Sequence, residues 1–361
     1  MLAGAKSVAK DLLPSPVYRG ARTVLRSFRE AVDYTLAFAV AARFGLPEAV
    51  MYFGAFGNGG VGDDLLCTAV LREMRKRGKS DLWIISNHPE IFEGRSDASR
   101  VFPFDRSYKK FPRIWGREFR SLTYERRDPV ADRSHAPARH IIAELCARAG
   151  ITGSVSLRPY LNLEIAERAE GVWAKNYIAI QSSGLAARHP MLNKQWFPER
   201  FQTVIDALRC EHEFIQLGSA NDPMLAHVRD LRGKTNLRQS AAILHNARMY
   251  VGGEGFLMHL ARSVECPSVV IYGGRTAPWQ TGYRCNDNLY TAVSCSPCWR
   301  WNTCHLDRKC MREIVVEDVV LAIREMISKP RGPLAVETAI IEEPHSGGLN
   351  AKQTIMSSFI A

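Results

Sequence analysis

Short apolar runs alternate with helix-periodic stretches through most of the chain. Runs rich in β-branched and aromatic residues predict buried strands at residues 50–56, 82–85, 177–180, 214–217, 249–252 and 268–272. Apolar residues at three- and four-residue spacing predict helices at residues 17–44, 65–74, 198–208 and 237–245. Because strands that alternate with helices form parallel sheets with right-handed crossovers, this pattern predicts an α/β fold.

The length and a break in the pattern predict two domains. At 361 residues the chain is longer than one core usually supports. A charged stretch with a proline, at residues 158–175, separates the two systems of strands. We therefore expect a helical extension over residues 1–47, a first Rossmann-like domain over 48–165, a second over 166–327 and a flexible tail over 328–361. Two such lobes would leave a cleft between them.

The helix predicted in the extension is amphipathic, with apolar residues on one face and Arg22, Arg26 and Arg29 on others. We expect it to pack against the body of the protein, and peripheral contact with an anionic membrane is the alternative. The chain has no apolar stretch long enough to cross a bilayer, and its first residues lack the apolar run of a secretory signal. A cytoplasmic location is expected, with the inner membrane face as the alternative address.

The formal net charge of +11 suggests an acidic partner. The excess is uneven, because residues 100–140 hold eleven Lys or Arg against five Asp or Glu. This basic segment could face phosphates of a substrate, or it could be an ordinary solvated surface. No nucleic-acid partner is expected.

A glycine-rich turn, residues 57–62, lies between the first strand and its helix and fits the pattern G-x-G-x-x-G. An NAD enzyme would also need an acidic residue at the end of the second strand, but Ser86-Asn87 stands there. Asp63 and Asp64 follow the glycines where the loop enters the helix, so Gly60, Gly62 and Asp64 are expected on a loop that borders the cleft. The two carboxylates could cap the helix, or one could act as a general base.

Two segments of the second lobe carry groups suited to a phosphate. Lys194 precedes Trp196 and Pro198 at the start of a predicted helix, where its charge could meet a diphosphate. Residues 247–274 read as strand, turn, helix and strand, with Glu254-Gly255-Phe256 in the turn and His259 one turn into the helix. A helix N-terminus binds anions through its free N–H groups, although His259 could equally be a buried core residue.

Together these motifs resemble the ADP-heptose:lipopolysaccharide heptosyltransferases, glycosyltransferase family 9, over most of residues 48–327. The resemblance implies a GT-B fold, in which two Rossmann-like, doubly wound parallel-sheet domains face a central cleft. It implies inverting transfer of a sugar, heptose or a related one, from a nucleoside-diphosphate donor, an ADP-sugar being favoured, to a hydroxyl of a glycan or lipid-linked acceptor. No catalytic metal is required if Lys194 and the helix dipole neutralise the diphosphate.

The resemblance also assigns roles to residues. Asp63 would be the general base, and Lys194, Glu254, Gly255, Phe256 and His259 would bind the donor. The sequence departs from the family at the turn, where Asp, a small residue and Gly are usual but Glu254-Gly255-Phe256 stands here. A donor other than ADP-heptose therefore stays open, as does a binding module without turnover; an NAD-dependent oxidoreductase is the remaining alternative.

Four of the nine cysteines, Cys295, Cys298, Cys304 and Cys310, lie within one short segment. Four thiolates on close loops suit Zn²⁺ or iron, and such a site would be structural because no coordination position stays open. Members of the resembled family carry a similar cysteine stretch here. Free thiols or disulfides are the alternatives.

Overall fold

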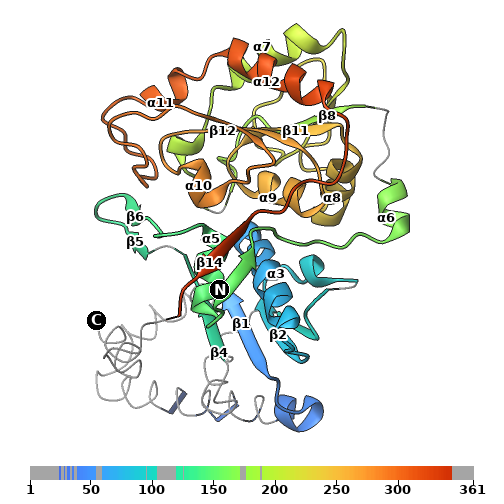
Figure 1. Cartoon of the computed structure of the whole chain (residues 1–361), viewed down its shortest axis with the longest axis vertical. Helices are drawn as coiled ribbons and strands as arrows, with labels where there is room; N and C mark the ends of the chain where they lie inside the picture. Colours follow the sequence, from blue (N-terminus) through green and yellow to red (C-terminus); the bar gives the residue numbers. More distant parts are fainter. Residues whose placement is uncertain are drawn as a thin grey trace, which may run out of the picture.

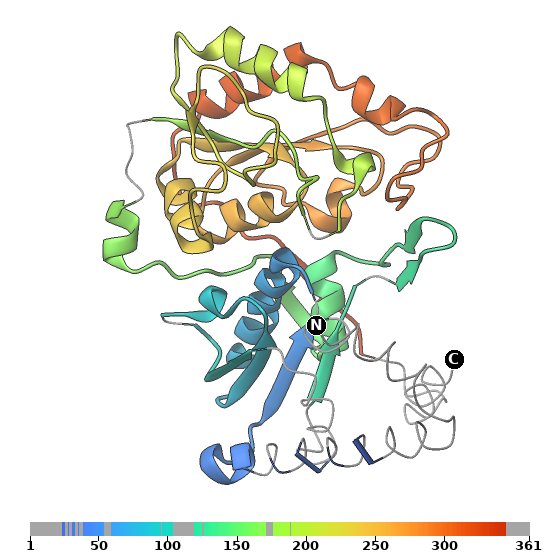
Figure 2. The ribbon, with the colours of Figure 1, turned by 180° about the vertical axis from the view of Figure 1, so that it is seen from behind.

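The computed structural model describes residues 24, 25, 28, 31, 32, 35, 39–53, 59–94, 96–103, 119–124, 126–170, 176–187 and 189–343. These residues form two α/β lobes, which lie one above the other in Figures 1 and 2. The start of the glycine turn at Gly57, much of the basic segment and the tail beyond residue 343 lie outside the described residues.

The first lobe is built on a four-stranded parallel sheet of order β3-β2-β1-β4. The elements of this lobe are β1 (Ala49–Phe53), α3 (Val61–Lys76), β2 (Leu82–Ser86), η1 (Pro89–Phe92), β3 (Arg100–Pro103), β4 (Phe119–Leu122), β5 (Arg126–Asp128), β6 (Arg133–His135), α5 (Ile141–Arg148) and β7 (Gly153–Ser156). Strands β5 and β6 form a separate antiparallel hairpin. Every residue of β1 and β2 is buried, as their unbroken apolar runs predict.

The second lobe has a six-stranded sheet of order β10-β9-β8-β11-β12-β13, parallel throughout. Its elements are α6 (Ile165–Glu170), β8 (Ile178–Ile180), η3 (Leu192–Lys194), α7 (Pro198–Leu208), β9 (Phe214–Gln216), β10 (Arg229–Asp230), α8 (Leu237–Asn246), β11 (Met249–Gly253), α9 (Phe256–Ser263), β12 (Ser268–Tyr272), α10 (Pro278–Thr281), β13 (Asp287–Tyr290), α11 (Lys309–Arg312) and α12 (Val316–Ser328). The predicted α/β class and the parallel sheets are confirmed.

The two lobes share apolar packing. One cluster of buried residues joins Leu66 of α3 and Ile141 of α5 to Leu257 and Leu260 of α9. A second cluster lies on the other face of the second sheet, under α7 and α12. Burial of this kind contributes about 25 cal/mol per Å² of apolar surface, so the lobes are held together as well as linked by the chain.

The end of the described chain differs from the predicted flexible tail. After α12 it returns to the first lobe, where β14 (Thr338–Ile341) pairs antiparallel with β7 and Ile341 is buried (Figure 1). The four-residue strand has no periodicity of its own, and its partner lies far away in the sequence, so the sequence pattern could not reveal it. Residues 344–361 of the predicted tail are not described.

Among the described residues of the N-terminal helix, those of the last turn show the expected packing. Val40, Ala41 and Phe44 pack against the outer face of the first sheet, and the Phe44 ring meets Trp83 edge-on. By contrast, Val24, Leu25, Phe28 and Val32 are 49–70% exposed. In the described part of the chain, no helix has the length and apolar character needed to span a bilayer.

Candidate active site between the lobes

Each sheet has a point at which the order of its strands reverses, between β1 and β4 in the first lobe and between β8 and β11 in the second. Ligands of doubly wound sheets bind beyond the carboxyl ends of the strands at such a point, because the connections diverge there. A cavity of about 750 Å³ lies between the lobes and is lined by residues that follow β1, β8, β9 and β11. Both reversal points therefore open onto one space.

Asp63 enters this cavity from the first turn of α3. Its Oδ2 accepts a hydrogen bond from the Gly60 N–H at 2.9 Å, and its Oδ1 accepts one from the Tyr124 hydroxyl at 2.8 Å. Tyr124 follows β4, so the neighbouring strand of the reversal point helps to orient the carboxylate. Asp63 thus caps its helix and faces the cavity at once, and the two predicted alternatives do not exclude each other.

Asp64 does not line the cavity, unlike Gly60, Gly62 and Asp63. Its side chain is buried and accepts a hydrogen bond from the Ser86 hydroxyl at the end of β2. Burial raises the pKa of Asp64 to about 7. Successive residues of a helix point about 100° apart, which is why one carboxylate reaches the cavity and the other turns into the lobe.

Lys194 and Glu254 face the cavity from the second lobe as an ion pair, in which Glu254 is buried and Lys194 is half-buried. Burial alone would raise the pKa of Glu254, but the charge and hydrogen bond of Lys194, together with the charge of Arg275, hold it below its ordinary value. The sequence does not predict this pair, because it assigns each of the two residues separately to binding of the donor. In this pair, Glu254 neutralises part of the positive charge that Lys194 presents to an anion.

The first turn of α9 also opens onto the cavity, through Gly255, Phe256 and Leu257. The N–H groups of a first helical turn have no partner within their helix and can bind an anion. A Cβ on Gly62 would lie 3.7 Å from Phe256, so the starts of α3 and α9 lie side by side across the lobes. The structure therefore brings Asp63 into one cavity with the groups that are suited to bind a phosphate, Lys194 and the first turn of α9.

His259 lines the same cavity and is 5% exposed. Its Nδ1 lies 2.7 Å from the Tyr283 hydroxyl. Burial lowers the pKa of His259 to about 3. The imidazole is accordingly neutral at pH 7 and offers a hydrogen bond, but no positive charge, to a ligand.

The far end of the cavity is polar and lies beyond β8 and β9. Asp222 is 4% exposed there, and its Oδ2 accepts hydrogen bonds from the Ser219 N–H at 3.0 Å and the Gln181 side chain at 3.4 Å. Its Oδ1 is buried and has no hydrogen-bond partner among the described residues. Such an oxygen is costly to bury unless a ligand donates to it.

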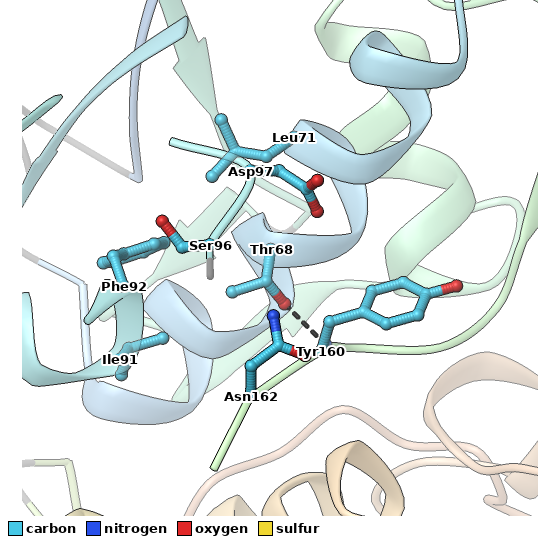
Figure 3. A pocket seen from close by; sticks show the side chains of 8 residues that line it. All are labelled: Thr68, Leu71, Ile91, Phe92, Ser96, Asp97, Tyr160 and Asn162. Carbon is cyan, nitrogen blue, oxygen red and sulfur yellow. Dashed lines mark hydrogen bonds between the residues drawn. The ribbon is translucent and has the colours of Figure 1, made fainter. Parts of the chain in front are cut away.

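A second pocket, inside the first lobe, is too small to compete with this cavity (Figure 3). It holds about 10 Å³ between Thr68, Tyr160 and the segment around Asp97. The Tyr160 N–H donates to the Thr68 hydroxyl at 2.8 Å across its edge, as the dashed line in Figure 3 marks. This volume is about that of one water molecule.

Comparison with known proteins identifies the family of the chain. The sequence profile of glycosyltransferase family 9 (heptosyltransferase) matches residues 115–307, more than half of the chain. The chain belongs to glycosyltransferase family 9. It is therefore a glycosyltransferase that uses a nucleotide-sugar donor, and membership excludes the NAD-dependent oxidoreductase and favours an enzyme over a binding module. No curated protein matched the chain in sequence.

Solved structures share the fold of this family 9 glycosyltransferase. The ADP-heptose LPS heptosyltransferase II of E. coli has a TM-score of 0.59 at 14% identity, over 78% of this chain and 98% of that one. A family 9 glycosyltransferase of Veillonella parvula has a TM-score of 0.59 at 15% identity, over 78% and 98%. TibC of enterotoxigenic E. coli, described as an iron-containing dodecameric glycosyltransferase, has a TM-score of 0.58 at 15% identity, over 78% and 77%. TibC has also been solved with ADP-D-β-D-heptose. The fold is GT-B.

The four-cysteine segment of this glycosyltransferase lies beside Gly274, after β12. The Cys298 N–H donates to the Gly274 carbonyl at 2.8 Å, and a Cβ on Gly274 would lie 3.1 Å from the Cys310 Sγ. All four cysteines are free thiols. As placed, no three Cys, His, Asp or Glu side chains in the described part of the chain are arranged to hold a metal ion. The structural metal predicted for this segment stays a prediction of the sequence.

Little of the described charge of the basic segment reaches the cavity of this glycosyltransferase. Of its Lys and Arg residues that the structure describes, Arg127 alone lines the cavity. The described part of the segment therefore does not form a phosphate-binding wall. The sequence also missed Arg275, which is 3% exposed, lines the cavity and lies with its guanidinium carbon 4.7 Å from the Trp299 ring centre. The one indication was its place beyond the carboxyl end of β12.

His140 joins the lobes at the start of α5. Its Nδ1 accepts the Ile142 N–H at 3.2 Å, which leaves Nε2 protonated to donate to the Gly282 carbonyl of the second lobe at 2.9 Å. Burial lowers the pKa of His140 to about 4. Unfolding frees this histidine to bind a proton below its ordinary pKa of about 6.5, while the folded protein binds none until about pH 4. The stability that depends on neutral His140 therefore falls as the pH falls through that window.

We expect this effect to disappear in His140→Asn, which can still cap the helix. Between pH 6.5 and pH 5 the wild type should lose about 1.5 kcal/mol more of its free energy of unfolding than the variant does. Urea unfolding of both proteins at the two pH values measures the difference. His305→Asn, at an exposed histidine, is the control and should keep the wild-type dependence. Equal pH dependence in wild type and His140→Asn would contradict the prediction.

Proposed function

We propose that this glycosyltransferase moves a heptose or related sugar from an ADP-sugar to a hydroxyl of a glycan or lipopolysaccharide-type acceptor, with inversion at the anomeric carbon. The observation that carries the proposal is that Asp63 and the Lys194 and α9 groups line one cavity from opposite lobes. An inverting transfer needs a base on one face of the donor sugar and a stabilised leaving group on the other. The ADP-D-β-D-heptose bound to TibC supports an ADP-sugar as donor.

The proposed chemistry is a single displacement. Asp63 takes the proton of the acceptor hydroxyl as that oxygen bonds to the anomeric carbon, and the bond from this carbon to the diphosphate breaks with its electron pair leaving on the phosphate oxygen. Lys194 and the N–H groups of Gly255, Phe256 and Leu257 stabilise the charge of that leaving group. The Asp222 Oδ1, which has no hydrogen-bond partner among the described residues, accepts a hydrogen bond from a hydroxyl of the donor's ribose.

The acceptor side of the proposal rests on the first lobe. Arg127 is the basic group of the described segment that meets the cavity, so we propose that it holds an anionic group of the acceptor. The exposed apolar face at Val24, Leu25, Phe28 and Val32 supports contact with an anionic membrane that carries this acceptor.

A panel of nucleotides and acceptors tests the function. ADP and ADP-sugars should raise the melting temperature of the purified chain more than other nucleoside diphosphates do, because a ligand that binds only the folded state stabilises it. Transfer should release ADP, form the anomer opposite to that of the donor by NMR, and proceed faster with a lipid-linked acceptor in anionic vesicles than in detergent. If no nucleoside diphosphate stabilises the protein and no sugar is transferred, the proposed function is wrong.

A further inference from the structure

The β5–β6 hairpin of the first lobe is bonded to a loop of the second. The Asp132 carbonyl accepts the Trp301 N–H at 3.0 Å, and the Asp132 Oδ2 accepts the N–H groups of Asn302 at 2.9 Å and Thr303 at 2.7 Å. Ser134, fully buried, donates its N–H to the Trp299 carbonyl at 2.9 Å and accepts the Trp301 indole N–H at 3.0 Å. We call these contacts the clasp. Figures 1 and 2 show the hairpin reaching toward this loop beside the space between the lobes.

On its other side, the same loop is hydrogen-bonded to residues 192–194, the segment that carries Lys194. The Trp301 carbonyl accepts the Asn193 N–H at 3.1 Å, and the Thr303 carbonyl accepts the Asn193 side-chain amide at 3.0 Å. The Asn302 Oδ1 accepts the Leu192 N–H at 2.9 Å. Leu192 and Asn193 belong to η3, whose last residue is Lys194. A continuous path of hydrogen bonds therefore runs from a carboxylate of the first lobe to the backbone that carries the cavity lysine of the second.

The clasp is built around a charge. Burial tends to raise the pKa of Asp132, but the N–H groups of Thr303 and Asn302 hold it below its ordinary value, so the carboxylate is charged at neutral pH. Hydrogen bonds to a charged acceptor are shorter and about twice as strong as neutral ones. Asp132 has a φ of +46°, a left-handed conformation that aspartate tolerates better than most residues. The turn thus presents both its carbonyl and its carboxylate to the loop.

We propose that Asp132 is a positioning residue that fixes Lys194 through the Trp299–Thr303 loop and so couples contact between the lobes to binding of the donor diphosphate. This inference rests on the proposed role of Lys194. The Arg127 guanidinium carbon lies 4.5 Å from the Trp301 ring centre, which ties the clasp to the acceptor side of the cavity as well. An acceptor that displaces Arg127 would thereby act on Trp301 and, through it, on η3, which carries Lys194.

Hydrogen exchange of the full chain without ligand tests the path directly. In Asp132→Ala, amides of residues 299–303 and of residues 191–194 should both exchange at least about tenfold faster, because local opening becomes easier when its closing bonds are lost. Asp128→Asn is the matched control, since the Asp128 Oδ1 accepts only the N–H groups of Val130 and Ala131 within the hairpin, both at 3.1 Å. Its effect should stay in residues 128–131.

ADP binding tests the consequence. Asp132→Ala should weaken ADP affinity about three- to tenfold, a part of the free energy of charged hydrogen bonds, whereas Asp128→Asn should not. Ser134→Ala, which removes only the bond from the Trp301 indole, gives a smaller effect of the same kind and serves if Asp132→Ala does not fold. The proposal is overturned if residues 191–194 keep wild-type exchange when 299–303 loosen, if neither segment changes, or if ADP affinity is unaffected. Exchange is measured without substrate, so a failure to find sugar transfer would sink the proposed function and leave this result standing.

Discussion

Asp63→Asn is expected to reduce sugar transfer at least about a hundredfold, the low end of what a general base contributes, with donor binding retained. The amide has the same shape and can still accept the Gly60 N–H that caps α3, so the helix should be kept. It cannot take a proton from the acceptor. Transfer rates at saturating donor and ADP affinity by calorimetry separate the two effects.

The neighbouring carboxyl provides the control. Asp64→Asn replaces a side chain that is buried against Ser86 and lies outside the cavity, so transfer should stay near the wild-type rate. An amide is also a close mimic of the protonated acid that the raised pKa of Asp64 favours. Full activity in Asp63→Asn would reduce Asp63 to a helix cap and leave the reaction without its base.

Lys194→Met is expected to damage stability and catalysis together. It leaves the Glu254 carboxylate, whose side chain is 5% exposed, without its ion-pair partner. Removing one partner of a buried pair typically costs about 3–5 kcal/mol of unfolding free energy. Transfer should also fall about 10²- to 10³-fold, as on loss of one group that stabilises developing charge. Denaturant unfolding and transfer assays measure the two losses.

The double variant Lys194→Met with Glu254→Gln separates these losses. With no buried charge left uncompensated, most of the stability should return, while transfer should stay low because the leaving diphosphate still lacks its cation. Glu254→Gln alone completes the cycle. If transfer returned together with stability, Lys194 would be only the structural partner of Glu254.

Much of the fold follows from local pattern. The runs predicted near residues 50–56 and 82–85 are β1 and β2, and the helix predicted over 198–208 is α7 with the same bounds. These elements could be predicted because a strand buried on both faces is an unbroken apolar run, and a helix buried on one face has apolar residues with a period of 3.6. The hairpin β5–β6 has no such pattern, because its strands read Arg-Arg-Asp and Arg-Ser-His. The residues of the second lobe that it contacts, near Trp301, lie far away in the sequence.

The site divides in the same way. The glycine turn, Lys194 and the turn before α9 were identifiable by residue type and order. Contacts between distant positions were not, such as Tyr124 with Asp63 or Lys194 with Glu254. The metal site predicted from the cysteine spacing stays a prediction, because spacing along the chain does not determine how the four side chains lie in space.

By itself, the sequence determined two parallel α/β lobes and the chemical groups at the ends of their strands, because both depend on neighbouring residues. Only the tertiary structure decided that Asp63 and not Asp64 faces the cavity, that Lys194 is paired with a carboxylate, and that Asp132 bridges the lobes. The physical reason is that these choices depend on the rotation of a helix against its sheet and on the packing of one lobe on the other. Both are set by contacts between residues far apart in the chain.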